Sequence, residues 1–190
     1  MHILILGLIV FLGAHSLPMA PDLRARAAKR LGENGYQALF SVASIAGFAL
    51  IVWGYGLARA APIIVWDPPL WTRHLAAALM ILAFILFIAA YIPGKIREKI
   101  RHPMLAGVKI WAFAHLASNG TLADIVLFGA ILAWAVSDRI SVKKREAAGL
   151  ITVTGGPLRN DVAAIVVGLA AYIVFALWLH QWLIGVAAFA

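Results

Sequence analysis

Six apolar segments divide this chain of 190 residues, and they limit its fold more than any other feature. A bilayer core of about 30 Å needs roughly 20 apolar residues in an α-helix, with a range near 17–25. The segments cover residues 1–17, 36–57, 71–92, 103–118, 121–136 and 161–184, and the first and fourth are short. We therefore expect an all-α, polytopic membrane helix bundle of six transmembrane helices, two of them short.

The overall composition supports this interpretation. Hydrophobic residues make up 64% of the chain and charged residues 13%, with a net charge of +8. Soluble proteins are nearer 45–50% apolar by typical usage, and disordered chains and coiled coils are poorer still in apolar residues. The sequence therefore predicts a single membrane domain over residues 1–190, embedded in the lipid bilayer.

The basic residues predict an orientation, because they gather in alternate connections between the apolar segments. Cytoplasmic connections of membrane proteins are enriched in Lys and Arg. We expect basic cytoplasmic loops at about residues 18–35, 94–102 and 139–160, with both termini outside the cytoplasm. The first segment lacks the basic start of a signal peptide, so we expect it to remain as an uncleaved helix. This pattern is typical of a multi-pass protein of the bacterial inner (cytoplasmic) membrane, and it explains the positive charge without nucleic-acid binding.

Histidine is the plausible ligand residue of this chain, because the sequence contains six histidines and no cysteine. Ionisable groups inside spans are costly and are therefore candidates for function. His15 lies near the end of the first segment and His115 near the end of the fourth. Such a pair is suited to axial ligation of haem, to a transition-metal site with a third ligand, or to proton relay. Haem fits best, since two histidines on facing helices are sufficient for it.

A stripe with four-residue spacing runs along the fourth segment through Gly107, Trp111, His115 and Asn119. Glycine on such a stripe allows the close approach of a flat ring, or equally the plain packing of a neighbouring helix. His102 lies thirteen residues before His115 and points about 220° away on a regular helix.

Other polar residues near the span ends are secondary candidates. Depth alone favours His102 as the partner of His15, and His74 or His180 as the partner of His115. A long cation near a span end pairs with a haem propionate or, as the commoner alternative, with a lipid phosphate. The cations in question are Lys109, Arg73 and Arg101.

Two stretches resemble a known family. LIVFLGAHSLPM (Leu8–Met19) and RHPMLAGVKIWAFAHLASNGTLADIVLFG (Arg101–Gly129) are similar to the NnrU family of bacterial membrane proteins, across nearly the whole chain. That family is associated with denitrification. The plant and cyanobacterial zeta-carotene isomerases, which carry haem b, are similar to it in turn. The resemblance implies haem b (iron) held by His15 and His115, which match the histidines of the GAHS and WAFAH elements.

One departure from those isomerases affects the chemistry. The cysteine that they carry three residues before the second histidine would fall at Ala112 here, so a Cys/His ligand exchange cannot operate. We therefore expect isomerase-like or redox chemistry on an apolar polyene or a small gas. The alternative is a non-catalytic accessory or assembly protein for respiratory nitrite and nitric oxide reductases.

Overall fold

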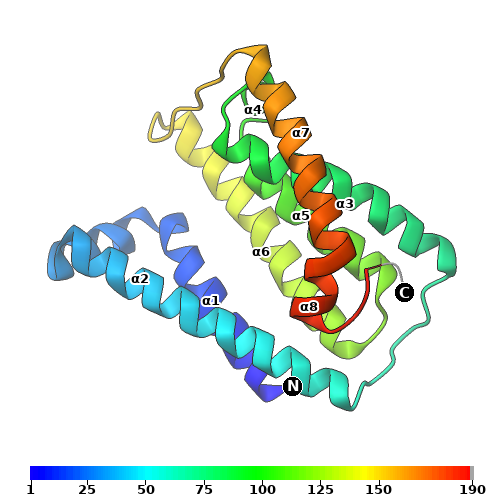
Figure 1. Cartoon of the computed structure of the whole chain (residues 1–190). Helices are drawn as coiled ribbons and strands as arrows, with labels where there is room; N and C mark the ends of the chain where they lie inside the picture. Colours follow the sequence, from blue (N-terminus) through cyan, green and yellow to red (C-terminus); the bar gives the residue numbers. More distant parts are fainter. Residues whose placement is uncertain (189–190) are drawn as a thin grey trace. The chain divides into compact units, whose positions relative to one another are not determined.

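Helices make up almost all of the regular structure in the computed structural model, which describes residues 1–188. The all-α prediction is therefore confirmed. Figure 1 shows the helices in chain order. They are α1 (His2–Ser16), η1 (Leu17–Met19), α2 (Pro21–Ala60), α3 (Leu70–Tyr91), α4 (Lys95–Ile100), α5 (Pro103–Ser118), α6 (Leu122–Ala147), α7 (Leu158–Val174), the π-helical η2 (Phe175–Leu179) and α8 (His180–Ile184).

Five helical segments are long and apolar enough to cross a membrane. They are His2–Met19, Pro21–Ala60, Leu70–Tyr91, Leu122–Ala147 and Leu158–Ile184. Each corresponds to one of the apolar segments of the sequence. The remaining predicted span is α5, whose 16 residues extend only about 24 Å at 1.5 Å per residue. The structure therefore supports five long spans and places a shorter apolar helix where the sixth was expected.

The connections predicted to be basic contain a good deal of helix. Residues 21–31 form the first part of α2, and a non-helical Gly32 (φ 71°, ψ 160°) kinks that helix before its apolar part. Residues 95–100 form α4, and α6 continues through the basic residues to Ala147. Charged residues are good helix formers, so a helix that leaves the apolar region ends only at a breaker such as glycine or proline.

The chain forms two compact units. The first unit contains Met1–Trp66 and Gly120–Val142. Its main contact is between α1 and α2. Glycines allow the two backbones to touch: a Cβ atom at Gly7 would lie 2.6 Å from Ile51 N, and one at Gly47 would lie 2.7 Å from Phe11 N. Gly54 faces the backbone of Leu4 even more closely.

The second unit contains Asp67–Asn119 and the chain from Lys143 onward. In it α3 packs against both α5 and α7. Gly107 of α5 contacts Phe87, and Gly168 of α7 contacts the backbone of Ile85. The glycine is in each case on the helix that packs against α3, and α3 fills the contact with a side chain at Gly107 and mainly with its backbone at Gly168.

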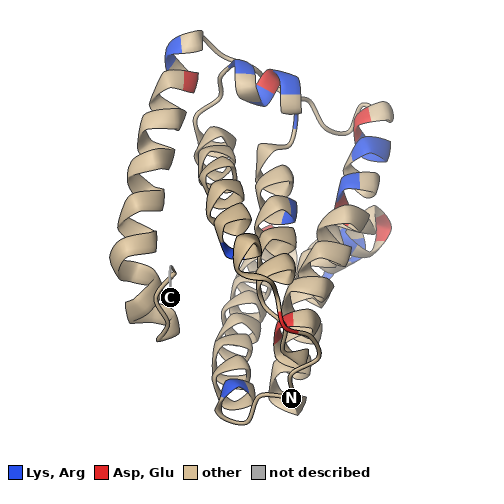
Figure 2. Ribbon diagram, turned by 90° about the vertical axis from the view of Figure 1, so that its right-hand side faces the viewer, with Lys and Arg blue, Asp and Glu red and all other residues tan. Residues whose placement is uncertain are grey.

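Asp161, in the first turn of α7, connects that helix to the start of α4 by hydrogen bonds. Its two carboxylate oxygens accept the backbone N–H groups of Lys95 (2.8 Å) and Ile96 (2.9 Å), the first free donors of α4. Asn160 Nδ2 donates to the carbonyl of Pro93 at 2.7 Å. Both residues lie in the first turn of α7 and bond to the segment that begins α4. Figure 2 shows that charged residues are sparse along the apolar stretches of the ribbon and occur mainly near helix ends and connections.

Two glycines of α2 provide a first prediction. Gly54→Ala should destabilise the protein by roughly 1–3 kcal/mol, because the new methyl group overlaps the backbone of Leu4. Gly56→Ala, two residues further along the same helix, adds its methyl group to open space and should not destabilise. Thermal unfolding of both variants in detergent measures the difference. Equal unfolding midpoints would show that the α1–α2 contact has room for a methyl group at Gly54.

A second prediction concerns the cap of α4. Asp161→Ala removes both acceptors from the start of that helix and should cost about 1–2 kcal/mol of unfolding free energy. Asp67→Ala removes an exposed carboxylate and serves as the matched control. Limited proteolysis between residues 93 and 101, together with thermal unfolding, should show faster cleavage in Asp161→Ala alone. Unchanged cleavage would mean that the cap does not hold this helix in place.

Candidate functional site

His15 lies in the last turn of α1, half-buried among aromatic rings. Its ring stacks on Phe11 with centroids 4.1 Å apart and is tilted against Phe40 at 5.1 Å. The indole of Trp134, from α6, meets it edge to face at 5.9 Å. All four residues belong to the first unit. Three aromatic rings therefore contact this imidazole.

His115 occupies the matching place on α5, again in the last helical turn. Trp111, one turn earlier, lies 5.2 Å away between ring centroids. The predicted four-residue stripe therefore does bring Trp111 and His115 together. His115 is half-buried and belongs to the second unit, whereas His15 belongs to the first.

The two histidines share one hydrogen-bond arrangement. His15 Nδ1 lies 2.8 Å from the carbonyl oxygen of Phe11, and His115 Nδ1 lies 2.9 Å from that of Trp111. A carbonyl oxygen only accepts, so each Nδ1 must carry the proton and donate it. In a neutral imidazole the lone pair then resides on Nε2. Each ring is thus oriented by its own helix and presents Nε2 as the acceptor or ligand atom.

This arrangement is what a metal-binding histidine requires. A ligating imidazole usually donates its second N–H to a carbonyl or carboxylate, which fixes the tautomer and the ring orientation. Both histidines therefore fit an iron ligand by the chemistry of their donor atoms. Within residues 1–188, no three His, Cys, Asp or Glu side chains form a group able to hold a metal ion. The alternative for these histidines was a transition-metal site with a third protein ligand. Residues 1–188 contain no such group of ligands.

Trp134 adds a polar group beside His15. Its indole Nε1 is buried and has no hydrogen-bond partner among the described residues. Buried N–H groups are nearly always paired, so an orphan next to an oriented imidazole is informative. An indole N–H only donates. Trp134 Nε1 is therefore a donor without a partner in residues 1–188, on a ring whose centroid lies 5.9 Å from that of His15.

The other residues of the predicted stripe have structural roles. A Cβ atom at Gly107 would lie 2.7 Å from the ring of Phe87, so this glycine is filled by helix packing and not by a flat cofactor. Asn119 Nδ2 donates to the carbonyl of His115 at 2.9 Å and to Ser118 Oγ at 3.3 Å, which closes the end of α5. For Gly107 the helix-packing alternative is the one that the structure supports.

The secondary candidates fall into two groups. His102 Nε2 and Arg101 Nε both bond to Glu146 Oε1, at 2.8 and 2.9 Å, and form a polar clamp at the end of α6. His74 and Arg73 are exposed on the first turn of α3, and Lys109 is half-buried on α5. These residues are separate from the ring environments of His15 and His115 described above.

Sequence reasoning missed a buried carboxylate network in the first unit. Asp124 is only 4% exposed; its Oδ1 accepts the hydroxyl of Tyr55 at 2.5 Å, and its Oδ2 accepts the N–H and hydroxyl of Thr121. The available signal was the Thr121-x-x-Asp124 spacing, which is typical of a capping box. Tyr55 lies 69 residues away, and nothing local to the sequence pairs it with Asp124.

Fold and composition together define the class: this is a multi-pass α-helical membrane protein. A family model described as NnrU protein matches residues 3–188, and the chain therefore belongs to the NnrU family. The resemblance found in the sequence is thus confirmed across almost the whole chain. Neither a curated protein nor a solved structure matches it.

The network around Asp124 leads to a third prediction. Tyr55→Phe removes the hydroxyl that bonds to a buried carboxylate, which should cost about 1.5–3 kcal/mol of unfolding free energy. Tyr91→Phe removes the same hydroxyl from a residue that is 77% exposed, and should leave the unfolding free energy almost unchanged. Thermal unfolding in detergent compares the two. If both variants unfold at the wild-type midpoint, the Tyr55–Asp124 bond contributes nothing.

Proposed function

We propose that this NnrU-family protein binds haem b in the cytoplasmic membrane of a bacterium and acts in denitrification. The observation that carries the proposal is the shared arrangement of His15 and His115. Each donates Nδ1–H to the carbonyl four residues earlier and so keeps its lone pair on Nε2. An imidazole held this way is prepared to ligate iron, since no ring rotation or tautomer change is needed.

The protein's own contribution is orientation and exclusion of water. Phe11 and Phe40 hold the His15 ring from two directions, and Trp111 packs beside His115. Bound haem would supply iron coordination and redox chemistry toward a small gas or an apolar polyene. With no cysteine in the chain, a thiolate ligand is excluded, and the two oriented imidazoles are the ligands we propose.

The proposal also includes a topology. With α5 as a short sixth span, both termini would lie outside the cytoplasm, and the alternation of basic connections supports this orientation. A helix of about 24 Å spans a bilayer where the lipid thins locally around it, at a modest cost in free energy. Cysteine-accessibility labelling of single cysteines added at each terminus tests this, since a wild-type chain without cysteine gives no background.

The fourth prediction tests the haem itself. The protein, purified in detergent from haem-replete cells, should show a Soret band and sharp α and β bands on reduction. His15→Asn and His115→Asn should each lower the haem content severalfold. Asparagine keeps an N–H donor near the Nδ1 position and therefore the bond to the backbone, but it removes Nε2. The loss then reports on ligation and not on helix stability.

His74→Asn is the matched control, because His74 is an exposed histidine of another span. Its haem content should equal that of the wild type. A colourless wild-type preparation would overturn the haem proposal and leave a non-catalytic accessory role for nitrite and nitric oxide reductases. Unaltered haem in both asparagine variants would overturn the assignment of the ligands alone.

A further inference from the structure

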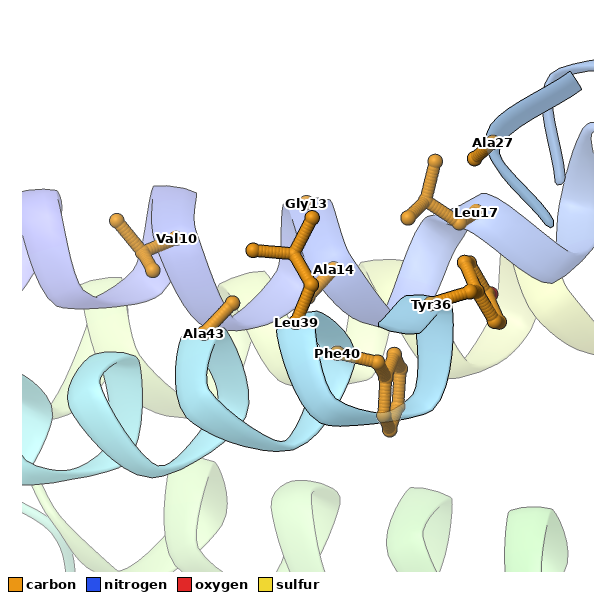
Figure 3. Close-up of a pocket in the computed structure, with 9 residues that line it drawn as sticks. All are labelled: Val10, Gly13, Ala14, Leu17, Ala27, Tyr36, Leu39, Phe40 and Ala43. Carbon is orange, nitrogen blue, oxygen red and sulfur yellow. The ribbon is translucent and has the colours of Figure 1, made fainter. Parts of the chain in front are cut away.

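An apolar groove runs between α1 and α2 within the first unit, and His15 is not among the residues that line it. Its volume is about 320 Å³, at the small end of the roughly 300–1,000 Å³ of ligand pockets. Figure 3 shows the lining side chains, all apolar except for one phenol. They are Val10, Gly13, Ala14, Leu17, Ala27, Tyr36, Leu39, Phe40 and Ala43.

The kink at Gly32 creates this groove. It allows the first part of α2 to run in a different direction from the rest of the helix, so that Ala27 and Tyr36 both reach the end of α1 near Leu17. On α1 the lining residues recur at positions 10, 13, 14 and 17, which is one helical face. Gly13 is exposed, and a Cβ atom there would meet nothing within 4 Å. The groove is therefore open at Gly13, whereas Gly7 on the same helix lies directly against the backbone of α2.

One end of the groove is cationic. The guanidinium of Arg24 lies 5.4 Å from the centroid of the Tyr36 ring, which forms that end. Arg24 also pairs with Glu33 at 2.9 Å through one nitrogen, and its side chain is 47% exposed. A guanidinium has five N–H donors, so a single carboxylate does not saturate it. Residues 21–35 carry four basic side chains, Arg24, Arg26, Lys29 and Arg30, against two acidic ones.

We propose that this groove binds one anionic phospholipid of the surrounding membrane, with an acyl chain along α1 and the phosphate at Arg24. An amphiphile matches both parts of the site: apart from the Tyr36 phenol the lining side chains are apolar, and the end near Arg24 offers a positive charge. Arg24 is well suited to phosphate because its planar donors match the phosphate oxygens. A basic segment beside a span attracts anionic lipid headgroups, which favours a phospholipid over a neutral apolar molecule. This site uses neither His15 nor His115, so it does not depend on the haem proposal.

The test uses the full-length protein in detergent, phosphatidylglycerol as the anionic probe and phosphatidylcholine as the neutral one. Native mass spectrometry counts the lipid molecules retained at each concentration. The wild type should retain one phosphatidylglycerol and bind phosphatidylcholine about fivefold more weakly, as expected for one Arg–phosphate contact. Equal retention of both lipids would overturn the role of charge and with it the proposal.

Two glycine variants separate the groove from the general lipid surface. Gly13→Leu places a side chain into the groove, and Gly56→Leu adds the same side chain to an exposed, open position of α2. Gly13→Leu should lose the retained phosphatidylglycerol, whereas Gly56→Leu should keep it. Wild-type retention in Gly13→Leu would contradict the proposal. Circular dichroism and gel filtration of both variants establish that they are folded.

Arg24→Gln provides an independent measurement should Gly13→Leu fail to fold. It should lower the affinity for phosphatidylglycerol about fivefold, to the level of phosphatidylcholine, and leave the phosphatidylcholine affinity unchanged. A parallel titration with a free fatty acid distinguishes the two sources of an acyl chain. Tight fatty-acid binding that displaces phosphatidylglycerol would assign the groove to a free acid and overturn the phospholipid.

Discussion

Backbone amides inside a bilayer have no water to bond with, so every N–H and C=O within a span needs a partner from the protein. Helix interiors meet this requirement automatically, but helix ends do not. In this chain, side chains close several of those ends. Asp124 accepts the N–H of Thr121 at the start of α6, and Asn119 Nδ2 donates to the His115 carbonyl at the end of α5. Asp161 does the same beside the spans, where it accepts the first two N–H groups of the short connecting helix α4.

The same requirement explains the state of the two histidines. An imidazole in an apolar span has two nitrogens to satisfy, and an unpaired polar group there is costly. His15 and His115 each satisfy Nδ1 on the carbonyl one turn earlier, in their own helix. That local solution fixes the tautomer wherever the neighbouring helices lie. The lone pair is then left on Nε2, which is the atom that would bind a metal ion.

Much of this architecture could be predicted from the sequence, because its cause is local. The apolar runs located the five long spans and the shorter α5, and the spacing of Trp111 and His115 predicted their contact. Pairings between distant segments could not be predicted. Asp161 lies 65 residues from Ile96, and Tyr55 lies 69 from Asp124. Only the packing of helices brings such partners together, and no periodicity encodes it.

Glycine shows why packing also decides function here. Gly13 and Gly47 look alike in sequence, yet Gly47 is filled by the backbone of Phe11 and Gly13 faces open space. The contact that closes one glycine thereby shapes the groove beside the other. Phe40 lines that groove and also lies 5.1 Å from the ring of His15. Phe40 therefore connects the two proposals, because a lipid that displaced its ring would also alter the surroundings of His15.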